Sequence, residues 1–213
     1  MGELKKRKGL ISTSIISLII FILILIGISS NGFLVNLDSS INSLWAIKNP
    51  FLTNVSKIID LVFDTWSMIV ISLFLSVFLC FKYSKKEGAF FSFTILLGAA
   101  VIYLTKEFVQ RARPSNALIN SSSFAFPSGH TATAVVFFGL LIYLILRKSK
   151  SKSFKLVFIF VSIFMIVLIG FTRLYLNLHW FSDVLGGLAL GVFVLTSCIL
   201  LKNIFIETRK KII

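Results

Sequence analysis

The chain has 213 residues, of which 57% are hydrophobic and 14% are charged, and its mean hydropathy is +0.96. Its apolar segments are too long and too numerous for the core of a water-soluble protein of this size, which excludes that class. The sequence therefore predicts an all-α integral membrane protein. No linker or clear repeat divides the chain, so we expect one domain over residues 1–213. Cys80 and Cys198 both lie in apolar runs and indicate neither a disulfide framework nor a metal-binding pair.

Six apolar runs have roughly the length that a helix needs to cross a membrane. They cover about residues 10–29, 64–81, 88–105, 131–146, 154–172 and 183–201. The first run follows the basic stretch KKRK, and its length of about twenty residues favours a retained helix over a cleaved signal peptide. Residues 35–62, which include Trp45 and Pro50, predict an outer loop with one interfacial helix.

Basic residues are distributed unequally between the two ends of the predicted spans. Sixteen of the 22 Lys and Arg residues lie on the side that holds both termini; they are Lys5, Lys6, Arg7, Lys8, Lys82, Lys85, Lys86, Arg147, Lys148, Lys150, Lys152, Lys155, Lys202, Arg209, Lys210 and Lys211. The positive-inside rule places this side, and with it both termini, in the cytoplasm. The net charge of +14 then reflects topology and contact with anionic lipid headgroups, and no nucleic-acid partner is indicated.

The remaining six basic residues lie on the outer side of the predicted topology. Three of them are interpreted as solvated surface residues: Lys48, Lys57 and Arg111. The other three border the outer ends of the third and fifth spans: Lys106, Arg113 and Arg173. Because topology supplies no reason for cations at these ends, we expect an anion to bind there.

The third span ends in the sequence KEFVQRARP. Lys106 and Arg113 are seven residues apart, which corresponds to two helical turns and predicts that both face the same way. Pro114 is interpreted as the end of regular helix, because proline interrupts helical hydrogen bonding. This segment therefore predicts a pair of cations at the outer surface.

The fourth span begins in the sequence PSGHT, which holds one of only two histidines in the chain. Ser128 is a plausible N-cap, and Gly129 allows a close backbone turn into the helix. The free N–H groups of the first helical turn can bind an anion, and His130 lies in that turn.

The second histidine lies between the fifth and sixth spans, in the sequence TRLYLNLHWFSD. His179 and Asp183 are four residues apart, so the carboxylate can accept the imidazole N–H and fix its tautomer. The other ring nitrogen is then free to act as a nucleophile. Both histidines and three unexplained cations are thus predicted at one membrane face.

These motifs together resemble the signature of the type-2 phosphatidic acid phosphatase superfamily. The resemblance comprises K-x6-RP at Lys106–Pro114, PSGH at Pro127–His130 and TR-x5-H-x3-D at Thr172–Asp183, and it spans residues 106–183 in the family's order. One departure is Thr172, where the family usually has serine, but a hydroxyl is kept. The resemblance implies a six-helix membrane phosphatase with its active site at the outer membrane–water interface.

The resemblance also implies roles for individual residues. His179 would attack phosphorus to give a phosphohistidine, Asp183 would hold its ring, and His130 would protonate the leaving oxygen and then activate water. The phosphoryl oxygens would be bound by Lys106, Arg113, Ser128, Gly129 and Arg173. No metal or cofactor is implied. A zinc site built from the two histidines and Asp183 is conceivable, but the neighbouring cations would repel it.

A site of this kind at helix ends in a membrane favours a membrane lipid phosphate as the substrate. The resemblance implies a bacterial plasma-membrane enzyme that acts on undecaprenyl pyrophosphate, phosphatidylglycerophosphate or phosphatidic acid, and the sequence does not choose among them. Two alternatives stay open. A lipid phosphotransferase would share every motif, and a non-catalytic lipid-binding or transport protein would use the same cations.

Overall fold

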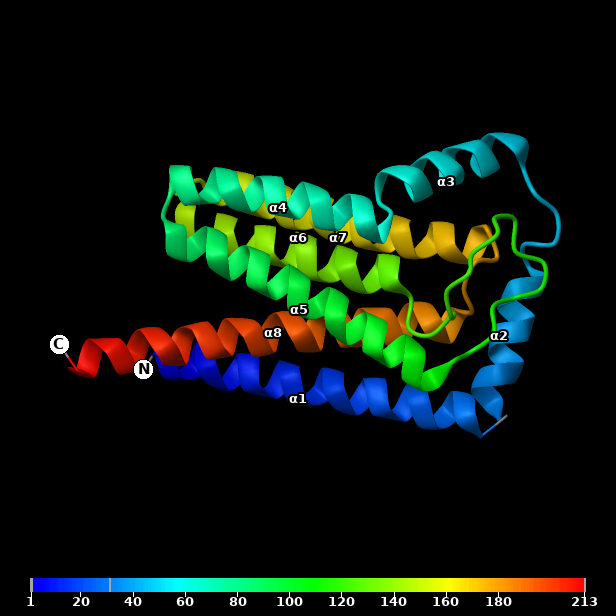
Figure 1. The fold of residues 1–213 in the computed structure, drawn as a ribbon, viewed down its shortest axis with the longest axis horizontal. Helices are drawn as coiled ribbons and strands as arrows, with labels where there is room; N and C mark the ends of the chain where they lie inside the picture. The colour runs from blue at the N-terminus through cyan, green and yellow to red at the C-terminus, as the bar shows by residue number, and fades with distance from the viewer. Residues whose placement is uncertain (1, 31, 213) are drawn as a thin grey trace.

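A computed structural model describes residues 2–30 and 32–212, which form eight α-helices joined by short turns and one long loop (Figure 1). The helices are α1 (Gly2–Ser29), α2 (Phe33–Ser43), α3 (Pro50–Val62), α4 (Thr65–Lys82), α5 (Lys85–Val109), α6 (Gly129–Lys148), α7 (Lys152–Tyr175) and α8 (Phe181–Ile212). Six of them are long and apolar enough to cross a membrane: α1 and α4–α8. The prediction of six helical spans in an all-α fold is confirmed.

Side-chain caps explain where several of the spans begin. Asp64 precedes α4, and its Oδ2 accepts a hydrogen bond from the backbone N–H of Trp66 at 3.0 Å. Ser84 caps α5 in the same way, and Ser151 caps α7. Each cap satisfies one of the N–H groups that a helix start leaves without an intrahelical partner. Helices α5 and α7 therefore begin two to three residues before their predicted apolar runs, whereas α4 begins one residue after the start of its run.

Residues 35–62 differ from the prediction of one interfacial helix, because this segment contains two helices. The break between α2 and α3 includes Asn49 and Pro50. Pro50 occupies the first turn of α3, and Asn49 accepts a hydrogen bond from the backbone N–H of Leu52 at 3.2 Å. Proline is tolerated at a helix start but cannot continue a preceding helix, so the chain turns here. Both helices lie at the end of the bundle opposite the two chain termini (Figure 1).

The outer end of α5 also differs from the prediction. The helix ends at Val109, and Gln110 has a left-handed backbone with φ of 50°. Residues 110–128 then form a loop. The backbone N–H of Leu118 attaches it to the oxygen of Leu176, and a backbone hydrogen bond from Ala125 to Arg111 joins its two sides. The prediction that Lys106 and Arg113 share one helical face is therefore wrong, since Arg113 lies in the loop.

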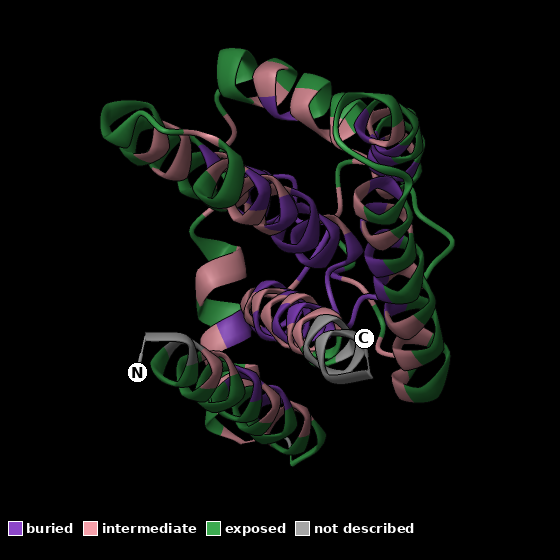
Figure 2. Cartoon of the chain, turned by 90° about the vertical axis from the view of Figure 1, so that its left-hand side faces the viewer, coloured by how far each residue is buried: buried purple, intermediate pink, exposed green. Residues whose placement is uncertain are grey.

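Helices α6 and α8 bury the largest share of their residues among the six spans and pack against each other at the centre of the bundle (Figure 2). Glycines in α8 allow the close approach. A Cβ added at Gly187 would lie 2.6 Å from the backbone oxygen of Ser128, and one at Gly191 would lie 2.8 Å from that of Ala132. Small residues let membrane helices approach backbone to backbone. This contact fixes the start of α6 beside the start of α8, where both histidine motifs lie.

Candidate active site

A cavity of about 610 Å³ opens between α4, α5 and the loop at the end of the bundle that carries α2 and α3. Five of the sequence-predicted site residues line it: Lys106, Arg113, Gly129, His130 and His179. Its polar wall continues with Ser121, Ser122 and Ser123, whereas the remaining wall is mostly apolar and comes from α4 and α5. The structure thus brings cations and both imidazoles from distant parts of the chain to one cavity.

His179 lies in the short connection between α7 and α8, and its side chain is buried. Nη1 of Arg113 lies 3.3 Å from the ring Nε2. Because a guanidinium can only donate, this contact assigns the lone pair to Nε2 and the proton to Nδ1. Burial, together with the positive charges of Arg113 and Lys106, lowers the pKa of His179 well below its ordinary value. The ring is therefore a neutral imidazole whose basic nitrogen faces the cavity.

Asp183 lies beside His179, as its spacing in the sequence predicts. Its Oδ2 is 3.4 Å from Nδ1 of His179, yet Nδ1 makes no hydrogen bond among the described residues. The same Oδ2 accepts a hydrogen bond from the backbone N–H of Trp180 at 2.9 Å. The carboxylate therefore faces the proton of the imidazole but is about half an ångström from a normal hydrogen bond.

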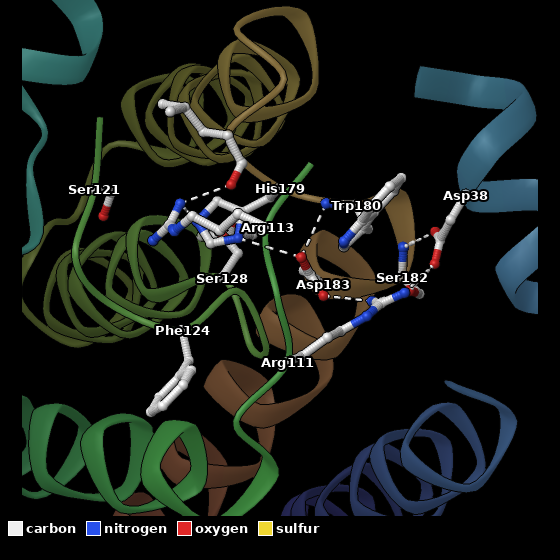
Figure 3. A network of polar contacts seen from close by, with 12 residues as sticks. Asp38, Arg111, Arg113, Ser121, Phe124, Ser128, His179, Trp180, Ser182 and Asp183 are labelled. Carbon is white, nitrogen blue, oxygen red and sulfur yellow. Dashed lines mark hydrogen bonds and ion pairs between the residues drawn. The ribbon is translucent and has the colours of Figure 1, made fainter. Parts of the chain in front are cut away.

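The interpretation of Arg111 and Lys48 as solvated surface residues is wrong. Arg111 donates to Oδ1 of Asp183 at 2.5 Å and to Oδ2 of Asp38 at 2.6 Å (Figure 3). Lys48 donates to the backbone oxygen of Tyr175 and to the side chain of Asn177. Both cations therefore donate hydrogen bonds to oxygens of residues that are distant in the sequence. Only the third residue of that group, Lys57, is exposed.

Lys106 and Arg113 are held at the cavity by the loop that follows α5. Arg113 donates from Nε to the backbone oxygen of Ser123 at 2.8 Å and from Nη1 to that of Leu178 at 2.6 Å. Lys106 donates to the backbone oxygen of Phe124. Burial lowers the pKa of Arg113 from its ordinary value, although a guanidinium stays charged in proteins. The two cations are thus fixed in place by backbone oxygens, and no carboxylate among the described residues forms an ion pair with either of them.

His130 lies in the first turn of α6 and faces two carboxylates that the sequence analysis did not single out. Its Nε2 lies 3.2 Å from Oδ1 of Asp60 and 3.3 Å from Oδ1 of Asp64, but makes no hydrogen bond among the described residues. Asp60 and Asp64 are four residues apart at the outer end of the span predicted over residues 64–81, Asp60 before it and Asp64 at its first position, on the side of the unexplained cations. That spacing was the available signal.

Asp60 also forms an ion pair with Arg173, whose side chain is completely buried. Burial alone would raise the pKa of Asp60, but the contact with His130 and the charge of Arg173 outweigh it and lower this pKa to about 2. The guanidinium also donates to Oγ1 of Thr172 at 3.1 Å. Neither Arg173 nor Asp60 belongs to the residues that line the cavity, and the guanidinium is occupied by Asp60.

The start of α6 also differs in part from expectation. Ser128 occupies the N-cap position but makes no side-chain cap; its Oγ pairs with Oγ1 of Thr131 at 2.9 Å, and the residue is completely buried. A Cβ added at Gly129 would lie 3.2 Å from Oγ1 of Thr65 and 3.7 Å from Cε of Lys106. Gly129 therefore allows Thr65 of α4 to lie close to the helix start, whereas its distance to the lysine is an ordinary van der Waals contact.

The arrangement combines a neutral imidazole, a second imidazole beside two carboxylates, and two cations held by backbone oxygens. A tetrahedral anion with several oxygens, such as a phosphoryl group, matches this set of donors. Within residues 2–30 and 32–212, no group of three or more His, Cys, Asp or Glu side chains is placed to hold a metal ion.

Known proteins are similar to this chain in sequence and in fold. Phosphatidylglycerophosphatase B of Bacillus subtilis is 28% identical over 183 residues, which are 84% of this chain and 90% of that protein. Lipid A 1-phosphatase of Rhizobium johnstonii is 30% identical over 117 residues, or 50% of this chain and 44% of that protein. The crystal structure of a transmembrane PAP2-type phosphatidylglycerolphosphate phosphatase from Bacillus subtilis has a TM-score of 0.81, with 21% identity, over 90% of this chain and 96% of that chain.

The family match covers all three sequence motifs, including the two that contain His130 and His179. Residues 87–206 match the PAP2 superfamily, and this range includes α6, α7 and most of α5 and α8. Because the match extends over more than half of its length, the chain belongs to the PAP2 superfamily and is a multi-pass membrane protein of a family with lipid phosphatases among its members.

Proposed function

We propose that this protein is a membrane lipid phosphatase that hydrolyses a lipid phosphate or pyrophosphate. The observation that carries the proposal is the composition of the cavity wall. Cations and imidazoles line one part of it, and apolar residues of α4 and α5 line the rest, among them Ile69, Leu96, Ala99 and Tyr103. A lipid phosphate has the same two parts, an anionic headgroup and an apolar tail. A water-soluble phosphoester has no apolar tail that could contact the apolar wall.

The proposed reaction starts with attack of Nε2 of His179 on phosphorus. An N–P bond forms while the bond between phosphorus and the lipid oxygen breaks, and His130 gives its proton to that oxygen. Water then attacks the phosphohistidine, His130 takes a proton from it, and inorganic phosphate leaves. Asp183 supports the positive charge that develops on the ring of His179. Asp60 and Asp64 would accept hydrogen bonds from a protonated His130 and orient it.

The phosphoryl oxygens would be held by charges and backbone donors at the cavity. Lys106, Arg113 and the N–H groups of Gly129 and His130 would bind them, and the support is that all four residues line the cavity. Arg173 would bind another oxygen by exchanging Asp60 for the substrate, and buried Ser128 would shape the helix start behind it. The proposed mechanism uses these groups in place of a metal ion.

We further propose that the site faces the outside of a bacterial plasma membrane, with both termini in the cytoplasm. Both termini lie at the end of the bundle opposite α2 and α3 (Figure 1), and the basic residues of the α4–α5 and α6–α7 connections lie at that same end. In a background that lacks Cys80 and Cys198, a cysteine at exposed Ser43 or Asn120 should react with a membrane-impermeant reagent in intact cells. A cysteine at exposed Ser151 should not. Labelling at Ser151 alone would reverse this orientation.

Release of inorganic phosphate tests the activity itself. Purified protein in detergent or liposomes should release phosphate from at least one of phosphatidylglycerophosphate, phosphatidic acid and undecaprenyl pyrophosphate, and the release should survive EDTA. The relatives named phosphatidylglycerophosphatase B and lipid A 1-phosphatase favour a lipid monophosphate.

The same assay separates the alternatives. Transfer of the phosphoryl group to an added alcohol or lipid with little free phosphate would identify a phosphotransferase. Binding of these lipids without turnover would identify a non-catalytic protein. Activity that disappears with EDTA and returns with added zinc or magnesium would contradict the metal-free mechanism.

A further inference from the structure

Asp38, Arg111 and Asp183 form a buried series of charged groups that leads from α2 to the cavity (Figure 3). Asp38 has only 1% of its surface exposed, although it lies in a helix whose other residues are largely accessible. Its Oδ1 accepts a hydrogen bond from the backbone N–H of Ser182 at 2.8 Å, and its Oδ2 accepts one from Oγ of Ser182 at 2.6 Å. Asp38 therefore fixes the first turn of α8.

Arg111 connects this aspartate to the second one. Its Nη2 donates to Oδ2 of Asp38 at 2.6 Å, and its Nη1 donates to Oδ1 of Asp183 at 2.5 Å and to Oγ of Ser182 at 2.7 Å. A planar guanidinium fork can hold two carboxylates at fixed angles, which a lysine ammonium cannot do. Within the described part of the chain, the cavity wall does not include Arg111.

The contacts of Asp183 divide its two oxygens between different tasks. Oδ1 accepts from Arg111, whereas Oδ2 accepts from the backbone N–H of Trp180 and faces Nδ1 of His179 at 3.4 Å. Rotation of the carboxylate about its terminal bond would break both hydrogen bonds. Arg111 and the backbone N–H of Trp180 therefore fix the plane in which the carboxylate faces the imidazole.

The charges of the series also bear on the reaction. Asp183 is completely buried, and a buried carboxylate without a cation nearby is strongly disfavoured in its ionised form. The series itself, one guanidinium between two carboxylates, carries one net negative charge, and its Asp183 end lies on the Nδ1 side of the ring, opposite the contact of Arg113 with Nε2. That charge would balance the positive charge that the ring acquires when it bonds to phosphorus.

We propose that Arg111, held by Asp38, is a positioning residue that keeps Asp183 ionised and oriented toward His179. The inference rests on the proposed function, since it assigns a role within that reaction. It assigns a role in the reaction to Asp38 of α2 and to Arg111 of the loop after α5. The competing explanation is a structural one, in which the same contacts only attach α2 and the loop to α8.

The test compares Arg111→Gln with a control ion pair at the other end of the bundle. Lys202 and Glu87 form a contact of 2.6 Å, and their side chains are 11% and 14% exposed, close to the 15% of Arg111. With an aryl phosphate, Arg111→Gln should lower kcat about 100-fold, as loss of residues that orient a catalytic group commonly does, and change KM less than about threefold. Lys202→Gln should leave both parameters within about twofold of wild type.

Chemical rescue provides a readout that a structural role would not give. Millimolar guanidinium, well below denaturing concentrations, should raise the kcat of Arg111→Ala about tenfold or more, while sodium chloride at equal ionic strength should not. Asp38→Asn should lower kcat less than Arg111→Gln, because Arg111 can still pair with Asp183. If Arg111→Gln does not fold, Arg111→Ala purified with guanidinium and the Asp38→Asn variant carry the test.

The outcomes separate this inference from the proposed function. A kcat of Arg111→Gln within about threefold of wild type, or rescue by sodium chloride as effective as by guanidinium, would overturn the positioning role and leave the phosphatase intact. Wild-type protein that hydrolyses no phosphoester would overturn both.

Discussion

Replacing His179 with alanine is expected to abolish phosphoester hydrolysis with every substrate, lowering kcat by about 10⁴-fold or more. The reason is that the variant loses the proposed nucleophile, an imidazole whose Nε2 lies beside Arg113 and whose Nδ1 faces Asp183. An activated leaving group would not help, because the first bond to phosphorus could not form. Initial rates with a lipid phosphate and with an aryl phosphate measure the loss.

Binding and stability serve as controls for this variant. The cations at the cavity stay in place, so His179→Ala should still bind inorganic phosphate or vanadate, and its Tm in detergent should change by only a few degrees. Turnover of either substrate at more than about one per cent of the wild-type rate would show that a different nucleophile or direct water attack operates.

Replacing His130 with alanine should have the second largest effect, and its size should depend on the leaving group. A lipid alkoxide leaves poorly without a proton, so lipid hydrolysis should fall by about 10²–10⁴-fold. An aryl oxide leaves without help, so the first phosphoryl transfer to His179 should slow less than about tenfold. A series of aryl phosphates with different phenol pKa values measures this dependence in wild type and variant.

The contrast between substrates is what identifies His130 as the acid. In the variant, the rate of phosphoryl transfer should depend more steeply on the pKa of the leaving phenol than in wild type. If the rate of phosphoryl transfer to His179 falls by the same factor with lipid and aryl substrates, His130 binds or orients the substrate and does not donate a proton.

Much of the fold follows from the sequence because a membrane-spanning helix is specified locally. An apolar run of sufficient length must form a helix in lipid, where every backbone polar group needs an internal partner. The six spans were therefore predictable, and so was the proximity of His179 to Asp183, which are only four residues apart in the sequence. The break between α2 and α3 required more weight on Asn49 and Pro50 than the sequence analysis gave them.

The polar contacts of the site were less predictable because they depend on tertiary structure. Arg111 lies 73 residues from Asp38 and 72 from Asp183 along the chain, and no periodic pattern relates them. Arg113 reaches the cavity through a loop that begins at Gln110, whose left-handed conformation a helical spacing rule does not anticipate. Charged residues at helix ends indicate that they have binding partners, but only the tertiary structure identifies those partners.

The central claim is that the phosphoryl group passes through His179, and direct trapping of the intermediate tests it. Wild type, His130→Ala and His179→Ala are mixed with a radiolabelled aryl phosphate and quenched rapidly in base, which preserves phosphohistidine. Wild type should show label that rises and decays, mapped to His179. His130→Ala should accumulate more label and lose it slowly, because water attack lacks its base. His179→Ala should remain unlabelled. Label on His179→Ala, or no label on the other two proteins while they turn over, would contradict the proposed reaction.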